Sequence, residues 1–165
     1  MISNNALTLP LRPERTFAFV AGVEQYTLSR GWNLHGPARD ALRFAHWLTG
    51  PAQVPHENVR LLLSPLRPDE LDWTVTTGLA ALRDACRPAT EENVKNALQV
   101  ELPQCDGDLL WIFWAGHGFQ TGKGRCCCLA RTRTRGRSAI STSSRCCIGG
   151  AVTRSRETGS GSRPP

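Results

Sequence analysis

The sequence predicts an α/β fold built around a mostly parallel β-sheet. Three short apolar runs have the length of buried strands, and the segments between them carry apolar residues at helical spacing. The order strand, helix, strand, helix, strand forms a parallel sheet with helices on its faces, because crossovers between parallel strands are right-handed. Since doubly wound domains have about five or six strands, we expect a sheet that is truncated after its third strand.

The first strand and the first helix have the clearest signals. Thr16–Val23 is rich in aromatic and β-branched residues, which suits a strand that is buried on both faces. Residues 24–36 are predicted to form a loop. A helix is expected over Pro37–Thr49, with proline in its first turn and with Gly50 and Pro51 at its end.

The middle of the chain is less regular. Val59–Leu63 is an apolar run with the length of a strand. Residues 64–88 contain several prolines and are predicted to form a loop, with one short helix at Leu79–Ala85.

The next helix and the third strand lead to the candidate site. Thr90 is a good N-cap, and two glutamates follow it in the first turn, where the helix dipole favours negative charge. We expect this helix to run through Leu102 and to end at Pro103. Leu109–Ala115 is the most apolar run of the chain and the predicted third strand.

A histidine between two glycines directly follows the third strand. In open α/β sheets, active sites lie beyond the carboxyl ends of the strands, which is where this pattern places His117. A neutral imidazole can act as general base towards a thiol or water, and the amide N–H of Gly118 can point at a developing oxyanion. A structural histidine is the alternative.

Several segments match, in order and spacing, those of one peptidase family. They are Ala18–Val23 with Tyr26, Leu34–Ala41, Leu48–Gly50, Asn58–Leu63, Ala89–Val94 with Ala97 and Leu98, and Asp108–Leu110 running into Ala115–Gly118. With these segments, residues 16–124 resemble the caspase-like peptidases, including the metacaspase-type members. The resemblance implies a three-layer caspase-like fold and a cysteine-type endopeptidase with a Cys–His dyad and no cofactor. By the same resemblance, His117 is the dyad histidine and Gly118 helps to form the oxyanion hole.

The nucleophile of the resembled family has no clear counterpart in this chain. In that family the cysteine lies at the end of the next long strand, after an acidic and a small residue. Cys147, beside Cys146, is the candidate downstream of the histidine. However, Arg145 precedes the pair and no apolar strand leads into it, so an incidental thiol is the alternative.

Substrate recognition rests on two acidic residues. A protein or peptide substrate is implied by the resemblance, and Asp40 or Glu24 can bind a basic side chain of it. Asp40 can equally be a residue of the helix surface.

The composition changes sharply at residue 125. Residues 1–124 hold eleven basic and thirteen acidic residues, a net charge of −2, whereas residues 125–165 hold nine Arg and one Glu, a net charge of +8. All eleven aromatic residues precede Arg125. We therefore divide the chain into a leader (1–15), a partial peptidase domain (16–124) and an Arg/Ser/Cys-rich tail (125–165) with a disorder-like composition.

The tail has two interpretations. Its residue types are those that GC-rich coding DNA yields in a wrong frame. Shifted by one base, the codons of residues 126–128 can encode three leucines, and those of residues 138–147 can encode a partly acidic, leucine-containing segment. The chain would then be a frame-disrupted, inactive peptidase domain. The alternative is a non-catalytic pseudo-peptidase interaction module, with a genuine basic tail that binds anionic partners.

The sequence disfavours several other classes of protein. The contiguous cysteines at 126–128 and 146–147 suit neither a disulfide framework nor the paired ligands of zinc. No run of eighteen apolar residues and no signal peptide is found, so we expect no membrane association and a cytoplasmic location. Nucleic acid is not favoured as a partner, because the net positive charge belongs to the tail alone. An unpaired edge of the third strand would favour self-association.

Overall fold

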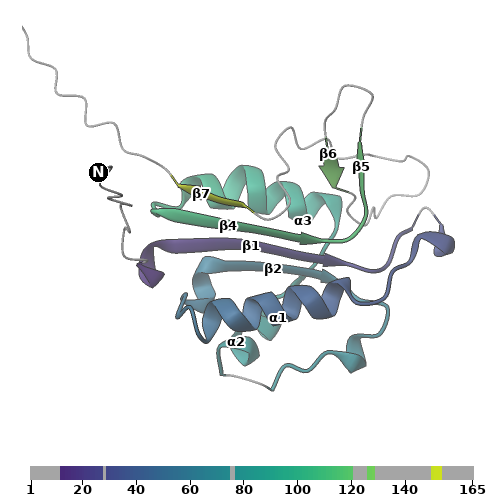
Figure 1. Ribbon diagram of the computed structural model, residues 1–165, viewed down its shortest axis with the longest axis horizontal. Helices are drawn as coiled ribbons and strands as arrows, with labels where there is room; N and C mark the ends of the chain where they lie inside the picture. The colour runs from purple at the N-terminus through teal and green to yellow at the C-terminus, as the bar shows by residue number, and fades with distance from the viewer. Residues whose placement is uncertain (1–11, 28, 75–76, 121–125, 129–149, 154–165) are drawn as a thin grey trace, which may run out of the picture.

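The computed structural model describes residues 12–27, 29–74, 77–120, 126–128 and 150–153. Its centre is a five-stranded sheet in the order β3-β2-β1-β4-β7 (Figure 1). The first four strands in this order are parallel, and β7 is antiparallel to β4. The strands are β1 (Thr16–Val23), β2 (Val59–Ser64), β3 (Arg87–Pro88), β4 (Leu109–Ala115) and β7 (Gly150–Thr153).

Helices cover both faces of this sheet, which gives three layers. The long helix α1 (Pro37–Thr49) and α2 (Thr77–Ala85) lie on one face, and α3 (Glu91–Lys95) lies on the other (Figure 1). Two separate apolar cores result, one between the sheet and α1 with α2, and one between the sheet and the segment that begins with α3. The chain is therefore an α/β protein with a mostly parallel sheet, as predicted.

Strand β1 is central because it is apolar on both faces. All of its residues except Phe17 are buried, and it pairs with β2 on one side and β4 on the other. Gly22 lets α1 approach closely: a Cβ at this position would lie 2.6 Å from the carbonyl oxygen of Pro37 and 2.8 Å from Ala41 Cβ. The strand and the helix are thus packed backbone against backbone at the start of α1.

The segment after α3 departs from a regular helix. Thr90 Oγ1 accepts the Asn93 N–H at 3.2 Å, so the predicted N-cap is confirmed. From Asn96 to Glu101 the chain forms a π-helix, and Leu102–Gln104 then forms a 3-10 turn. The helical segment therefore ends at Gln104, one residue beyond the predicted end at Pro103. Proline is tolerated there because it lies in the first turn of the 3-10 helix, where its missing N–H would have no partner.

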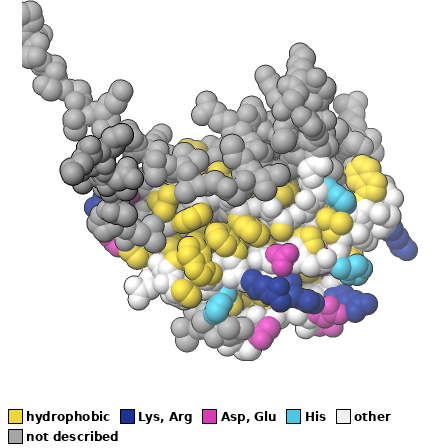
Figure 2. All heavy atoms as spheres, viewed as in Figure 1, with side chains coloured by type: hydrophobic (Ala, Val, Ile, Leu, Met, Phe, Trp, Pro, Cys, Tyr) yellow, Lys and Arg dark blue, Asp and Glu magenta, His cyan; other side chains and the backbone are white. Residues whose placement is uncertain are grey.

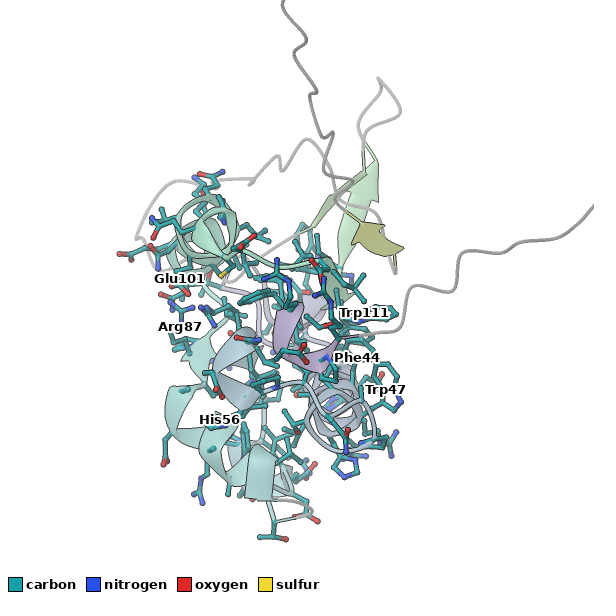
Figure 3. The ribbon with its side chains drawn as sticks, turned by 90° about the vertical axis from the view of Figure 1, so that its left-hand side faces the viewer. Phe44, Trp47, His56, Arg87, Glu101 and Trp111 are labelled. Carbon is teal, nitrogen blue, oxygen red and sulfur yellow. The ribbon has the colours of Figure 1, made fainter. Side chains whose placement is uncertain are left out.

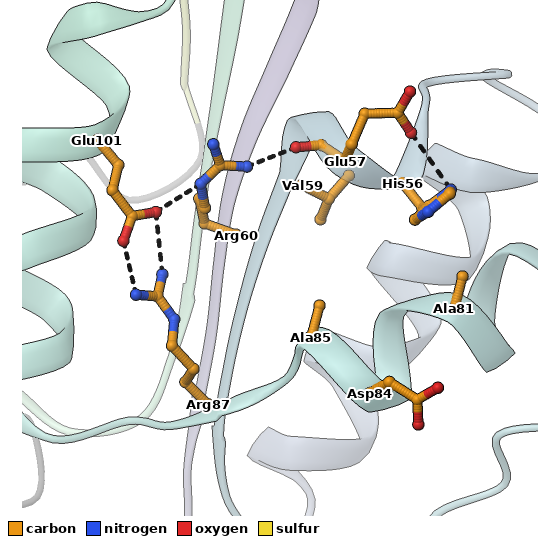
Figure 4. A pocket seen from close by; sticks show the side chains of 9 residues that line it. All are labelled: His56, Glu57, Val59, Arg60, Ala81, Asp84, Ala85, Arg87 and Glu101. Atoms are coloured by element: carbon orange, nitrogen blue, oxygen red, sulfur yellow. Dashed lines mark hydrogen bonds and ion pairs between the residues drawn. The ribbon is translucent and has the colours of Figure 1, made fainter.

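A carboxylate at the end of the π-helix ties this segment to the sheet. Glu101 is the last residue of the π-helix. Its carboxylate accepts a hydrogen bond from Arg60 Nε of β2, at 2.6 Å, and another from Arg87 Nη1 of β3, also at 2.6 Å (Figure 4). An open cavity of ≈ 560 Å³ lies beside these ion pairs, at the start of β2.

The remaining short elements lie in the connections. Four 3-10 turns and a two-stranded sheet of β5 and β6 complete the described structure. They are Pro13–Arg15, Arg30–Trp32, His56–Asn58, Pro68–Glu70, β5 (Gly118–Gln120) and β6 (Cys126–Cys128).

The sheet is larger than the sequence predicted. The three strands expected from apolar runs are confirmed as β1, β2 and β4, but β3 and β7 extend the sheet on both sides. The expected truncation after the third strand is therefore wrong as a description of the sheet. Residues 150–153, assigned to the tail, pair with Leu109–Ile112, so the expectation of an edge without a partner is also wrong for that part of β4. Backbone pairing needs no apolar side chains, which is why the apolar pattern missed β7.

Aromatic side chains gather where α1 crosses β4. Phe44 stacks on Phe113 with ring centroids 4.7 Å apart, and Trp47 meets Trp111 edge-on at 5.8 Å (Figure 3). In the view of Figure 2, hydrophobic side chains form a band across the middle of the molecule, and charged and histidine side chains lie below it. Trp47 is 39% exposed, so this cluster is only partly covered by the described residues. No helix within the described ranges is long and apolar enough to span a bilayer.

Candidate active site

The carboxyl ends of β1 and β4 bring the candidate site together. The two strands are parallel and paired up to Gly22 and Ala115, so the loops that follow them leave the same end of the sheet. The loop after β1 contains Tyr26 and Trp32, and the turn after β4 contains His117. Residues about ninety positions apart in sequence are thereby brought into contact.

Gly116 makes the turn after β4 possible. Its φ of 152° lies in a region that L-residues rarely adopt. A Cβ at this position would also lie 2.8 Å from Tyr26 Oη and 3.2 Å from Val23 Cβ. Only glycine therefore fits between the strand and the aromatic ring that supports the histidine.

Tyr26 holds the backbone and one face of His117. The His117 N–H donates to Tyr26 Oη at 2.7 Å, and this hydroxyl donates to the Val23 carbonyl at 3.2 Å. The two rings lie 4.9 Å apart between centroids. Tyr26 itself is buried, so the histidine rests on a fixed support.

The imidazole of His117 is oriented by a backbone carbonyl. Its Nε2 lies 2.8 Å from the carbonyl oxygen of Trp32, in the 3-10 turn Arg30–Trp32. Because a carbonyl can only accept a hydrogen bond, Nε2 carries the proton and the neutral ring keeps its lone pair on Nδ1. The residue as a whole is half-buried, and the hydrogen bond of its ring lies at the surface. This arrangement fixes one tautomer and leaves Nδ1 as the basic nitrogen.

Gly118 begins a short strand beside the histidine. It is the first residue of β5 and lies opposite Cys128 of β6. The sequence analysis considered Cys147 but gave no role to Cys128, whose backbone this pairing brings close to His117. The only sequence signal was its place in a run of three cysteines. Cys147 lies outside the described residues.

Asp40 lies on the surface of α1, in its first turn. Its carboxylate forms an ion pair with Arg43 Nη1 at 3.6 Å, one turn further along the helix. Both side chains are more than half exposed. The first turn of α1 lies at the same end of the sheet as the histidine, since α1 starts beside Glu24 at the end of β1.

Glu24 has a different environment from the one expected of a substrate-binding acid. Only 8% of the residue is exposed. Its Oε1 accepts the N–H groups of Gly36 at 3.0 Å and Ala38 at 3.2 Å, and its Oε2 accepts that of Leu66 at 2.9 Å. This environment does not favour Glu24 as a group that binds a basic substrate side chain, because the residue is buried and its oxygens already accept three backbone amides.

Neither of the cysteines described with side chains lies near the histidine. Cys105 precedes β4, at the opposite end of that strand from His117, and its thiol donates to the Glu101 carbonyl at 3.5 Å. Cys86 lies between α2 and β3 and packs against the core beneath α1. Burial raises the pKa of the Cys86 thiol to about 11, so this cysteine is almost entirely protonated at neutral pH.

The described residues contain no group of three or more His, Cys, Asp or Glu side chains arranged to hold a metal ion. The cavity beside Glu101 does not extend the histidine site either. It adjoins Val59 and Arg60 at the amino end of β2 (Figure 4). His117, in contrast, follows the carboxyl end of β4.

Comparison with known proteins gave no relatives. No family model, no curated protein and no solved structure matches this chain. The class that the geometry defines on its own is an α/β protein with an oriented histidine at the carboxyl end of a parallel sheet.

Proposed function

We propose that this chain carries the histidine-bearing part of a caspase-like cysteine endopeptidase domain, which in this chain is incomplete and inactive. The observation that supports the proposal best is the hydrogen bond between His117 Nε2 and the Trp32 carbonyl. It leaves Nδ1 as a base at the end of a sheet where active sites of α/β proteins occur. The segments that resemble this family, within residues 16–124, support the same conclusion.

The proposed reaction uses His117 twice. Nδ1 accepts the proton of a cysteine thiol, and the thiolate attacks the carbonyl carbon of the peptide substrate. The developing oxyanion receives a hydrogen bond from the Gly118 N–H. The imidazolium then gives its proton to the leaving amine as the C–N bond breaks, and water hydrolyses the thioester with the imidazole again as base. Throughout, the Trp32 carbonyl holds the Nε2–H and stabilises the positive ring.

Neither of the two cysteines whose side chains the structure describes fits the role of the nucleophile. Cys86 is buried and protonated, and Cys105 lies at the wrong end of β4. We therefore expect the chain to have no peptidase activity on Arg-, Lys- or Asp-containing peptides. Cys128 and Cys147 are the positions at which activity, if found, would have to be traced by substitution with serine.

The coding DNA after the Lys123 codon provides the decisive experiment. We expect the shifted frame to encode an apolar strand that ends in an acidic residue, a small residue and cysteine. A gene with the frame restored should then produce a protein that cleaves fluorogenic peptides. The matched control is His117→Ala in the restored protein, which should abolish turnover while the protein still unfolds cooperatively in a thermal melt.

Two results would contradict the proposal. One is a shifted frame without such a cysteine, and the other is a folded, frame-restored protein that cleaves no peptide. Either result would favour the non-catalytic interaction module instead.

A further inference from the structure

We infer that Glu24 is a positioning residue for His117, acting through the loop between β1 and α1. What this role means for catalysis rests on the proposed function. The contacts of Glu24, and the experiment that tests them, do not depend on that function. Glu24 does not touch the imidazole. Its role is to hold the segment whose Trp32 carbonyl orients the ring.

The carboxylate of Glu24 connects three parts of the chain. Gly36 and Ala38 belong to the loop end and the first turn of α1, and Leu66 belongs to the loop after β2. The helix has no side-chain cap from its own N-cap residue, so Glu24 supplies the missing acceptor from another element. A negative charge at this helix terminus is also favoured by the helix dipole.

The backbone of Glu24 holds the loop at a second point. Its carbonyl accepts the Leu34 N–H at 2.9 Å, and its own N–H donates to the Ser64 carbonyl at 3.0 Å. Leu34 is two residues beyond Trp32. Together with the carboxylate, this bond fixes residues 34–38 against the end of β1.

One further contact fixes the loop on the side of the histidine. Asn33 Oδ1 accepts the Tyr26 N–H at 3.0 Å, and Tyr26 is the residue that supports the ring of His117. Trp32 is therefore followed directly by two anchored residues. Because Trp32 is 46% exposed, burial of the indole does little to fix its carbonyl, which is held by these anchors and by the 3-10 turn, where the Trp32 N–H donates to the Ser29 carbonyl at 3.1 Å.

Glutamine cannot replace Glu24 in this arrangement. Three N–H groups point at two oxygens, and a glutamine would turn one of these oxygens into an N–H donor. A donor would then face the N–H of Leu66 or those of Gly36 and Ala38. The substitution Glu24→Gln should therefore release the loop while changing the size of the side chain very little.

The test reads the His117 ring directly by NMR of the full chain labelled with 15N-histidine, in the neutral form of the ring. In the wild type we expect an Nε2–H signal that exchanges slowly with water, assigned by its loss in His117→Gln. In Glu24→Gln the exchange should be at least about tenfold faster, the loss expected when a hydrogen bond of about 1.4 kcal/mol opens. If the glutamine variant does not fold, Glu24→Asp, which keeps the charge but shortens the side chain, should show the same acceleration.

The matched control is Glu101→Gln. This substitution makes the same chemical change in a carboxylate that also accepts several hydrogen bonds, from Arg60 and Arg87 among others, away from the site. It should lower stability and leave the exchange of the His117 Nε2–H unchanged. The inference is overturned by an unprotected Nε2–H in the wild type, or by folded Glu24 variants whose exchange stays within about twofold of the wild type. This test does not measure peptidase activity. A frame-restored protein that is inactive but has a protected His117 Nε2–H would therefore contradict the proposed function and leave this inference intact.

Discussion

Replacing Gly116 by alanine should destabilise the protein and disturb the histidine together. The added methyl group would lie 2.8 Å from Tyr26 Oη, closer than real Cβ atoms approach a heavy atom. The Tyr26 hydroxyl cannot retreat without cost, because it accepts the His117 N–H and donates to the Val23 carbonyl. The substitution thus acts on the contact that supports the site.

Three contributions set the size of the effect. An L-residue at the φ of 152° costs about 1–3 kcal/mol. Weakening the two hydrogen bonds of the Tyr26 hydroxyl costs about 1 kcal/mol each. Alanine also reduces the conformational entropy of the unfolded chain, which stabilises the folded protein by about 0.4–1 kcal/mol and offsets part of this loss. The expected net loss in the free energy of unfolding is about 2–4 kcal/mol, a large part of the 5–15 kcal/mol that is typical of a small domain.

Urea unfolding of the full chain measures this loss, and Gly31→Ala is the matched control. At Gly31 a Cβ would meet only Ser29 Oγ, at 3.5 Å, so the same substitution should change stability by less than about 0.5 kcal/mol. The His117 signals should shift in Gly116→Ala and not in Gly31→Ala. A Gly116→Ala protein that is as stable as the Gly31→Ala protein would refute the reasoning.

Three further predictions concern the rest of the molecule. The hydrogen bond from Arg87, more than any other contact, holds the pKa of Glu101 below its usual value. Its contribution to stability is therefore complete above the unfolded pKa of about 4.3 and is lost as the pH falls through the lower folded value. The stability difference between wild type and Glu101→Gln, from urea unfolding at several pH values, should shrink over that window, and a constant difference would contradict this. Cys86 should react with iodoacetamide at neutral pH at least about a hundredfold more slowly in the folded protein than in urea, since its pKa is raised to about 11. Mass spectrometry of the labelled peptide measures both rates, and equal rates would contradict this prediction. Leu62→Ala, at a fully buried position of β2, should cost about 2–5 kcal/mol in urea unfolding, whereas Val100→Ala, at a position 49% exposed, should cost less than about 0.5 kcal/mol.

The local elements could be predicted because their signals are local. The bounds of β1 and α1 agree with those expected from the apolar runs and from the proline and glycines around Pro37–Thr49. Thr90 was found as an N-cap for the same reason, since a cap acts within one turn. The π-helix after Lys95 was missed, and so were the contacts of Glu101 at its end with two arginines on neighbouring strands, which the sequence does not reveal.

The candidate site divides in the same way. The sequence analysis placed His117 at the end of a buried strand, since an apolar run followed by Gly-His-Gly is visible in the sequence. It missed Trp32, whose contact uses a backbone carbonyl that every residue possesses. It also named Glu24, beside Asp40, as a candidate for substrate binding, because an acidic residue in a loop gives no sign of the three amides that surround it in the fold.

The sequence by itself determined the order of β1, α1, β2, α2 and β4 along the chain and the end of the sheet that carries the histidine. Hydrophobic burial and turn chemistry act over a few residues, so both are encoded locally. Only the tertiary structure decided which nitrogen of His117 is basic, what Glu24 holds, and that residues 150–153 pair with β4. These depend on backbone groups that meet across long sequence separations, and a backbone amide or carbonyl is the same in every sequence.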